Sequence, residues 1–499
     1  MRRLGLVHGS RNTGDPGSPS VLASPPERAL AWVRSQEIPG QGIRVHSGRS
    51  DAYPEVTGYL IPTLIRYGER ELARRLVRWL VEVQRADGSY ASPEGPAYAF
   101  DTGQALRGLF AGAGLVPDAL HAARRAAEYL YRDLVDGGSA GFRKRYWYAI
   151  PETVQLHILR PLHRAADVFG KPEYRLAAEN CLRYYSHHKK ALRLDVLSHF
   201  LGYELEALID LGRPDLAIPL LADLRKRQAP DGSVCGEEGV PWVCTPGLAQ
   251  LAVCWYKIGE AAPADRAVAW LDAHQELSGG FRGSYGLGAR YFPETELPWA
   301  AKFYLDAHLL RVAAFFRGEK IMVPRFVPKA DGRARSVLSS VKPGDRVLEV
   351  GCGKGRYLRL VTDVYPDAMC VGLDLTGALL SSLPSTVKPV QGYMEALPCR
   401  DGAFDVVLSV EAIEHSANRR VAIQEMIRVT KKGGTVLVID KDQSQWGRLA
   451  CPRWERWSSV DEVIVLLEEG CESVEAEPVG YDDQAASDGL MILWHGQKR

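Results

Sequence analysis

The stretch Arg346-Val-Leu-Glu-Val-Gly-Cys-Gly-Lys-Gly-Arg-Tyr357 decides the fold of the carboxy-terminal part of this chain of 499 residues. Its first five residues have the pattern of a buried strand, three glycines follow at alternate positions, and 358–364 have a helical pattern. Glycines here let the backbone turn sharply and approach a ligand at the start of a helix. This order of strand, glycine loop and helix predicts a parallel α/β sheet with a nucleotide-type ligand at its edge.

Further predicted strands follow this stretch. The strand 370–373 ends in Asp374, 23 residues after Gly351, where a carboxylate suits the two hydroxyls of a ribose. Later Val/Ile/Leu runs predict strands at 404–410, 435–439, 473–479 and 491–495. The carboxy-terminal part is therefore predicted to be an α/β domain.

These motifs together resemble those of class I S-adenosylmethionine-dependent methyltransferases, and the resemblance covers roughly 333–499. It includes the run Gly392-Tyr-Met-Glu-Ala-Leu-Pro398 and the Lys432-Gly-Gly434 turn before a strand. The resemblance implies a Rossmann-like domain with a seven-stranded sheet that uses S-adenosylmethionine as its cofactor. The alternative, a dinucleotide dehydrogenase, would need a glycine where Arg356 stands.

The same resemblance implies a set of cofactor-binding residues. The glycine loop and the acid before it would hold the methionine portion, and Asp374 would bind the ribose. The family often has an acidic residue where this chain has Tyr393, so backbone groups and Met394 would hold the adenine instead. The expected set is Glu349, Gly351, Gly353, Gly355, Asp374, Leu375, Met394 and Glu395.

The acceptor side needs a group that removes a proton. Methyl transfer from a sulfonium is an in-line displacement, so the protein aligns the acceptor and accepts its proton. His415, just beyond the strand 404–410, is the candidate base toward a hydroxyl, with Glu411 or Glu414 orienting it. A packed or helix-capping histidine is the alternative reading. We expect O-methylation, with His415, Glu411 and Glu414 as the catalytic residues.

The amino-terminal part has helical periodicity up to about residue 320. Amphipathic helices alternate with more apolar helices that begin near Tyr53, Phe100, Glu152, Ser198, Trp242 and Trp299. This near-regular spacing predicts six helical hairpins that close as an all-α (α/α)6 toroid, with the more apolar helices inside. Turns such as Gln84-Arg-Ala-Asp-Gly-Ser89 resemble the repeats of squalene-hopene cyclases, which supports the architecture rather than terpene chemistry.

Aromatic and polar residues collect where the inner helices begin, at one mouth of the predicted toroid. Flat aromatics with carboxylates suit a polyhydroxylated ring. The stretch 279–302 resembles the helical domain of glucuronyl C5-epimerases, and the whole resembles toroidal glycoside hydrolases. Two alternatives to sugar binding remain open. The residues at this mouth are catalytic, or they are buried polar groups that only form hydrogen bonds with one another. The expected sugar-contacting residues are Tyr53, Glu55, Asp101, Glu152, His199, Trp242, Arg290, Tyr291, Glu296 and Trp299.

Composition bounds the remaining possibilities. The 62 basic and 61 acidic residues give a formal charge of +1, which offers no attraction to nucleic acid. The nine cysteines show no metal-type spacing, so we predict no metal centre. No apolar run is long enough for a transmembrane segment, and the first residues lack a hydrophobic signal, so a cytoplasmic location is expected.

The sequence thus predicts a flexible segment 1–24, a toroid 25–316, a linker 317–335 and a methyltransferase domain 336–499. The predicted function is methylation of a glycan or glycoconjugate that the toroid binds or modifies. In a first alternative, the toroid is an active uronate epimerase, lyase or hydrolase fused to the methyltransferase. In a second, the acceptor is a lipid or another small natural product. The sequence predicts no particular oligomeric state.

Overall fold

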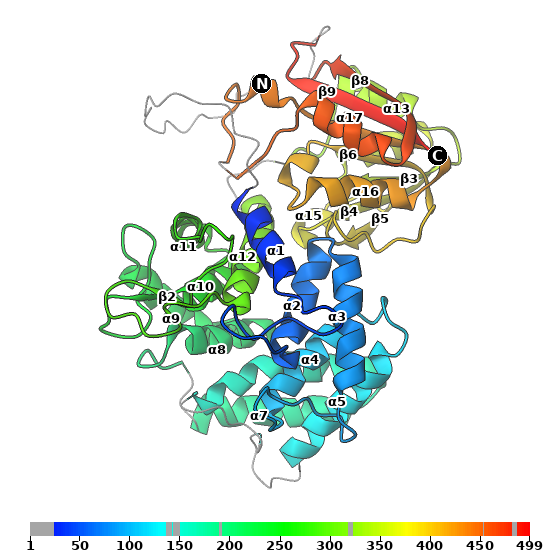
Figure 1. Ribbon diagram of the computed structural model, residues 1–499. Coiled ribbons are helices and arrows are strands. Elements are labelled where there is room, and N and C mark those ends of the chain that lie inside the picture. Colours follow the sequence, from blue (N-terminus) through cyan, green and yellow to red (C-terminus); the bar gives the residue numbers. More distant parts are fainter. Residues whose placement is uncertain are drawn as a thin grey trace.

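The computed structural model describes residues 24–135, 142, 150–188, 192–317, 323–452, 454–481 and 487–499. The predicted flexible segment, apart from residue 24, and residues 318–322 of the predicted linker lie outside the described residues. Figure 1 shows a helical unit formed by the first part of the chain and an α/β unit formed by the rest, with α1, α2 and α3 beside the boundary between them.

The helical unit alternates two kinds of helix, as predicted. The outer helices are α1 (Pro25–Ser35), α3 (Arg70–Val83), α5 (Ala119–Val135), α7 (Pro172–His188), α9 (Pro214–Arg227) and α11 (Ala261–Ala273). The more apolar inner elements are α2 (Pro54–Arg66), α4 (Ala99–Ala111), η1 (Glu152–Ile158) with α6 (Leu159–Phe169), α8 (Ser198–Asp210), α10 (Thr245–Lys257) and α12 (Pro298–Arg317). The short strands β1 (Val243–Cys244) and β2 (Ser284–Tyr285) pair in the loops.

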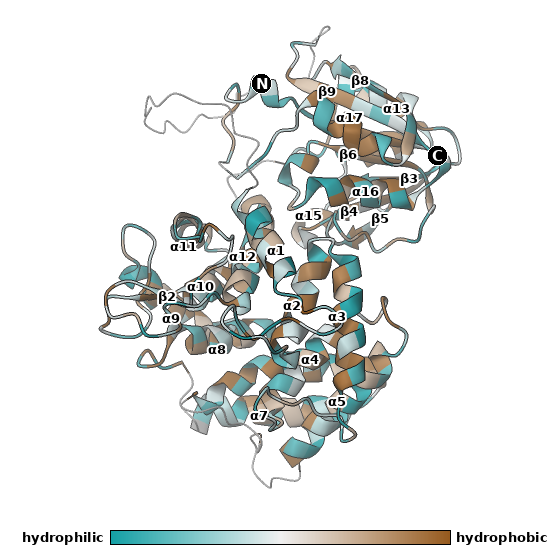
Figure 2. Cartoon of the chain, in the orientation of Figure 1, coloured by the Kyte–Doolittle hydropathy of each residue, from teal (hydrophilic) through white to brown (hydrophobic). Residues whose placement is uncertain are grey.

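The inner elements touch one another in sequence order. Helix α2 contacts α4, α4 contacts η1 and α6, η1 contacts α8, α8 contacts α10, α10 contacts α12, and α12 contacts α2. The inner helices are buried on nearly all sides, whereas an outer helix such as α3 buries only the stripe that carries Leu72, Leu76 and Leu80. Figure 2 shows hydrophilic and hydrophobic segments alternating along the outer helices α3 and α5.

The glutamine turns join neighbouring outer helices. Gln84 donates through Nε2 to the carbonyl of Gly88, 3.1 Å away, and to that of Ala122 on α5, 2.9 Å away. Gln275 makes the equivalent pair of bonds, and its second acceptor is the carbonyl of Pro25, 250 residues earlier in the chain. The last hairpin is thereby fastened to the first helix.

The α/β unit contains seven strands in one mainly parallel sheet, as predicted. The strands are β3 (Arg346–Val350), β4 (Met369–Asp374), β5 (Val387–Gln391), β6 (Phe404–Val410), β7 (Thr430–Lys441), β8 (Cys471–Val479) and β9 (Met491–Lys498), in the spatial order β5-β4-β3-β6-β7-β9-β8. Strands β3 to β7 are parallel, and β9 runs antiparallel to both β7 and β8. The order reverses direction between β3 and β6, the place where such sheets bind ligands.

Helices cover both faces of this sheet. Helices α13 (Gly332–Ser339) and α14 (Arg356–Val364) contribute to one apolar core, and α16 (Arg419–Val429) and α17 (Val460–Glu468) contribute to the other. A short helix α15 (Gly377–Leu380) and the 3-10 turns η2 (Ile413–His415) and η3 (Gln443–Gln445) lie in the loops. Among the described residues, no helix is long and apolar enough to cross a membrane.

The two units are in direct contact. Arg456 pairs with Glu27 at 2.8 Å, and Phe316 of α12 lies 5.0 Å from the ring of His415. Phe315 packs edge-on against Trp454, with ring centroids 5.3 Å apart. Arg66, the last residue of α2, lies 5.5 Å from the ring centre of Tyr393. The carboxyl ends of α2 and α12 and the start of α1 therefore face the α/β unit.

Candidate functional site

The glycine loop after β3 has the backbone geometry that only glycine adopts readily. Gly351, Gly353 and Gly355 have φ angles of 76°, 53° and 72°. A Cβ atom on Gly351 would lie 2.3 Å from Cβ of Ala412, and one on Gly355 would lie 2.4 Å from Cδ2 of Leu383. Close packing and positive φ angles therefore require glycine here, and the N–H groups of the three glycines donate to Leu373, Asp374 and Cys352 within the protein.

Glu349 lies on β3 beside this loop and is buried, with 1% of its surface exposed. Burial raises the pKa of its carboxyl to about 8, and Arg356 opposes that rise. Its Oε2 atom has no hydrogen-bond partner among the described residues. Glu349 is not among the residues that line a large cavity between the α/β unit and the helical unit, but a cationic ligand group that reached Oε2 would give this atom a partner.

Asp374 ends β4 and is tied to the glycine loop. Its carboxylate accepts hydrogen bonds from the backbone N–H groups of Gly353, at 2.8 Å, and Thr376, at 2.7 Å. Burial raises its pKa, and these backbone N–H groups oppose the rise. Asp374 and Leu375 both line this large cavity between the α/β unit and the helical unit.

In the loop after β5, some residues line the cavity and one is bound in the protein interior. Gly392, Tyr393 and Met394 line the cavity. Glu395 also reaches it, but its Oε1 accepts hydrogen bonds from the N–H groups of Ala417 and Asn418 at 2.6 and 3.2 Å. Burial raises the pKa of Glu395 to about 7. Glu395 thus joins this loop to the one before α16.

A cavity with a volume of 2760 Å³ extends from these loops to the helical unit. Its α/β wall contains the expected cofactor residues Gly351, Asp374, Leu375, Met394 and Glu395. Single-ligand pockets usually measure about 300–1,000 Å³. The cavity therefore has room for a second ligand beside a cofactor.

His415 lies on this cavity at the turn η2. Burial lowers the pKa of its ring to about 4, so the ring is neutral at pH 7. Its Nε2 is 3.3 Å from Oε1 of Glu414, which also pairs with Lys441. Glu455 completes a group of three in which the candidate ligand atoms of Glu414, His415 and Glu455 lie within 4.8 Å of one another. Lys441, 3.5 Å from Glu455, is the cation among them.

Glu411 makes different contacts from those expected. Its carboxylate pairs with Arg333 at 2.9 Å and with Arg356, which together lower its pKa. Its backbone has a φ of 52°, an unfavourable conformation for glutamate. The two arginines hold this residue in place, and Glu414 is the acid that directly neighbours His415.

The structure places most of the expected sugar-contacting residues in the packed interior. Tyr53, Glu55, Asp101, His199, Trp242 and Trp299 are each at most 8% exposed. Tyr53 donates to Asp101 at 3.0 Å, and His199 bonds through Nδ1 to Gln250 at 2.6 Å. These side chains are therefore buried among other side chains of the helical unit.

The other members of that set lie nearer the surface. Exposed Arg290 pairs with Glu237 and stands 5.9 Å from the ring centre of Trp242. Half-buried Glu296 accepts a hydrogen bond from Nε1 of Trp32 at 2.7 Å. Tyr291 packs 6.1 Å from His199, and half-buried Glu152 opens η1.

This set and the cavity lie at opposite ends of the inner helices. Tyr53 precedes α2, whereas Tyr67, which follows α2, lines the cavity. Thirteen residues separate the two ends, and at 1.5 Å per residue they span about 20 Å. A ligand held near Tyr53 would lie too far from His415 for direct methyl transfer.

Sequence reasoning missed the helical-unit side of the cavity. Asp265 and Asp272 of α11 and His308, Arg311 and Phe315 of α12 line it. His308 lies 3.5 Å from Asp272, which accepts a hydrogen bond from Tyr304 at 2.5 Å. In the sequence the polar residues among these look like ordinary positions on the outer helix α11 and in the carboxyl half of the inner helix α12.

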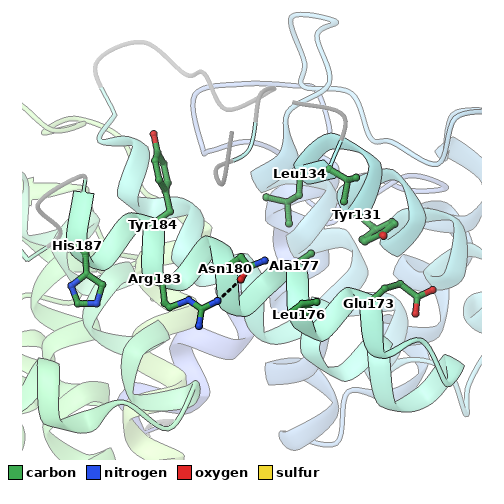
Figure 3. A pocket seen from close by; sticks show the side chains of 10 residues that line it. Tyr131, Leu134, Glu173, Leu176, Ala177, Asn180, Arg183, Tyr184 and His187 are labelled. Atoms are coloured by element: carbon green, nitrogen blue, oxygen red, sulfur yellow. Dashed lines mark hydrogen bonds between the residues drawn. The ribbon is translucent and has the colours of Figure 1, made fainter. Parts of the chain in front are cut away.

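A smaller hollow of 640 Å³ lies between α5 and α7 on the outside of the helical unit. Figure 3 shows Tyr131 and Leu134 on one helix opposite Leu176, Ala177 and Tyr184 on the other. None of the expected site residues lines it.

Comparisons with known proteins concern the α/β unit. Residues 348–438 match the family model described as a methyltransferase domain. The 2-methyl-6-phytyl-1,4-hydroquinone methyltransferase of Synechocystis sp. is 35% identical over 133 residues, which are 24% of this chain and 39% of that protein. A probable tRNA methyltransferase 9B of Mus musculus is 35% identical over 114 residues, covering 22% and 25% of the two chains.

Ajmaline N-methyltransferase of Rauvolfia serpentina is 33% identical over 109 residues, 19% of this chain and 35% of the relative. The chain thus spans less than half the length of these three relatives. A solved methyltransferase from Thermotoga maritima, described as a possible histamine N-methyltransferase, has 21% identity and a TM-score of 0.27, covering 34% of this chain and 90% of that one. The family match and the sheet together show that the α/β unit is an S-adenosylmethionine-dependent methyltransferase domain.

Proposed function

We propose that the protein transfers a methyl group from S-adenosylmethionine to an acceptor that binds in the cavity between its two units. One observation carries the proposal. The same cavity is lined by the carboxyl ends of β3 and β4, by the loop after β5, by His415, and by side chains of α11 and α12. Its volume of 2760 Å³ accommodates both reactants side by side.

The cofactor half of the site would use the residues expected from the sequence. The loop of Gly351, Gly353 and Gly355 and the carboxylate of Glu349 would hold the methionine portion, and Asp374 would bind the ribose. The unpartnered Oε2 of Glu349 fits the cofactor's ammonium group. When bound, the cofactor supplies an electrophilic methyl group on a sulfonium. Leu375 and Met394 would contact the remainder.

The acceptor half would centre on His415. A neutral ring can accept the proton that an acceptor hydroxyl loses as it is methylated. Glu414, 3.3 Å from the ring, orients it and stabilises its charged form. The rings of Phe316 and Trp454 pack against the imidazole, with centroids 5.0 and 5.6 Å away. Glu411 would act indirectly, because its carboxylate is bound by Arg333 and Arg356.

The charge of the cavity wall favours an acceptor that is not a polyanion. Its nine acidic residues outnumber its four arginines, so a phosphate backbone would be repelled. Tryptophan faces at 446, 454 and 457 beside carboxylates suit a polyhydroxylated ring. We therefore propose O-methylation of a glycan or glycoconjugate, with a lipid or another small natural product as the alternative acceptor.

We propose further that the helical unit is an (α/α)6 toroid that binds the acceptor. The contacts that lead from α2 through the other inner elements back to α2 support this architecture. In the alternative, the helical unit is itself a uronate epimerase, lyase or hydrolase. Burial raises the pKa values of Glu55 and Asp101 well above those of free carboxyls, as a proton donor requires. Deuterium exchange at C5 of a uronate would reveal the epimerase activity.

The proposed boundaries are 25–316 for the helical domain, 317–335 for the linker and 336–499 for the methyltransferase domain. The first 24 residues remain a predicted flexible segment. A cytoplasmic location and the absence of a nucleic-acid partner also remain predictions.

Isothermal titration of the full-length protein tests the cofactor assignment. The wild-type protein should bind one equivalent of S-adenosylmethionine, and Asp374→Ala should weaken binding at least tenfold. Exposed Asp363→Ala on α14 is the matched control. Unchanged affinity in Asp374→Ala would overturn the assignment.

The acceptor class needs a second assay. Transfer of radioactive methyl groups should be measured against a panel of neutral glycosides, uronosides, glycolipids, a hydroquinone, amines and tRNA. Methylation of a glycoside or glycolipid hydroxyl is the expected result. Preference for tRNA would contradict the charge argument, and preference for an amine or hydroquinone would establish the alternative acceptor.

A further inference from the structure

The cofactor of the proposed site must lie across the carboxyl ends of three neighbouring strands. The glycine loop follows β3, Asp374 ends β4, and the loop of Gly392 to Met394 follows β5, which is next in the sheet. If the methionine portion is held at β3 and the ribose at β4, the adenine falls at the loop after β5. Tyr393 is the aromatic side chain of that loop and lines the cavity.

Tyr393 is held from the helical unit by Arg66. The guanidinium of Arg66, the last residue of α2, lies 5.5 Å from the ring centre of Tyr393. Arg66 is anchored on its other side by Asp306, 3.7 Å away. Asp306 is buried and also binds Thr63 at 2.8 Å and Lys302 at 3.0 Å. The orientation of the cation on this ring is thus set by the interior of the helical unit.

Residues around the contact between Arg66 and Tyr393 also pack between the helical unit and the α/β unit. Tyr393 and Ala417 of the α/β unit pack against the apolar core of the helical unit. Gly68, just after α2, approaches Val421 so closely that a Cβ atom there would lie 2.0 Å from Cγ1 of Val421. Glu395 connects the loops of Tyr393 and Ala417 through its two hydrogen bonds. The cofactor loop is therefore fixed between the two units.

We propose that the helical unit completes the cofactor site, with Arg66 positioning Tyr393 as a stacking surface for the adenine of S-adenosylmethionine. This inference rests on the proposed cofactor site. The guanidinium lies 5.5 Å from the ring centre, and Tyr393 also lines the cavity, where a base would stack on its ring. Cofactor affinity then depends on a residue of the helical unit.

Titration of the full-length protein with S-adenosylmethionine and S-adenosylhomocysteine tests this. Arg66→Ala should weaken the binding of both about 3- to 30-fold, which corresponds to roughly 0.7–2 kcal/mol. Arg66→Lys should retain most of the affinity, because the cation remains. The matched control is Arg74→Ala on α3, whose partner is Glu71. Wild-type affinity in Arg66→Ala would overturn the proposal.

A double-mutant cycle separates positioning from a general structural effect. Tyr393→Ala should weaken binding and Tyr393→Phe should not, and adding Arg66→Ala to Tyr393→Ala should cause no further loss. Additive losses would show that Arg66 does not act through Tyr393, and an unaffected Tyr393→Ala would refute the stacking role. If thermal melts show that Arg66→Ala does not fold, the difference in cofactor affinity between Tyr393→Ala and Tyr393→Phe still tests the stacking role of Tyr393. A wild-type protein that binds neither ligand would instead refute the proposed function.

Discussion

Replacing Glu349 by glutamine should stabilise the free protein while weakening its cofactor binding. The pKa of Glu349 is about 8 in the folded protein, against an ordinary value of 4.5. Between these pH values the folded state holds a proton that the unfolded chain has released, so stability falls as pH rises. The slope is about 1.4 kcal/mol per pH unit, and the loss at pH 7 reaches about 3 kcal/mol.

Glu349→Gln removes this loss. Its unfolding free energy should therefore exceed that of the wild type by up to about 3 kcal/mol at pH 7, and the two should converge near pH 4.5. For a domain of this size the difference corresponds to a rise in melting temperature of about 6 to 12 °C. Thermal unfolding followed by circular dichroism between pH 4.5 and 9 measures it.

The same variant should bind S-adenosylhomocysteine at least about tenfold more weakly, because the ligand's ammonium loses a charged partner. Glu472→Gln, an exposed position on β8, is the control for both measurements. If the wild type and Glu349→Gln show parallel stability profiles over this pH range, Glu349 is already ionised in the free protein and the argument is wrong.

Three further variants test other parts of the site. His415→Asn should lower the rate of methyl transfer about 10²- to 10⁴-fold without changing cofactor affinity; equal rates would exclude His415 as the base. Arg333→Met leaves Glu411 and buried Asp331 with fewer partners and should lower the unfolding free energy by about 3–5 kcal/mol in urea titration. A loss below 1 kcal/mol would mean that the carboxylates find other partners. Gly355→Ala places a Cβ against Leu383 at a positive φ, which should cost about 2–5 kcal/mol in the same assay, whereas a wild-type midpoint would show that the loop relaxes freely.

Much of the fold is visible in the sequence because burial follows local periodicity. The glycine loop predicted the edge of the sheet, and the two helix types were distinguished by their apolar stripes. Strand β5 escaped the sequence analysis because it is an edge strand with mostly exposed residues and a proline at 389. The pair β1 and β2 is too short to leave a pattern.

The candidate site was predictable only on its α/β side. The cofactor-binding glycines and Asp374 can be recognised in the sequence because they directly follow predicted strands. Asp272 and His308 look like ordinary polar residues on helices. Which end of the inner helices faces the α/β unit is a property of three-dimensional packing. The sequence also could not show how deeply Tyr53, Asp101 and His199 are buried in the helical unit.

The bond between Gln275 and Pro25 has a consequence for synthesis of the protein in the cell. Its two partners are 250 residues apart, and at about 5–20 residues per second the ribosome needs roughly 12 to 50 s to make the intervening chain. During that interval α1 lacks its contacts with α12, and Trp32 lacks its hydrogen bond to Glu296. The nascent chain would therefore expose apolar surface of α1, to which chaperones can bind, until the last hairpin has been synthesised.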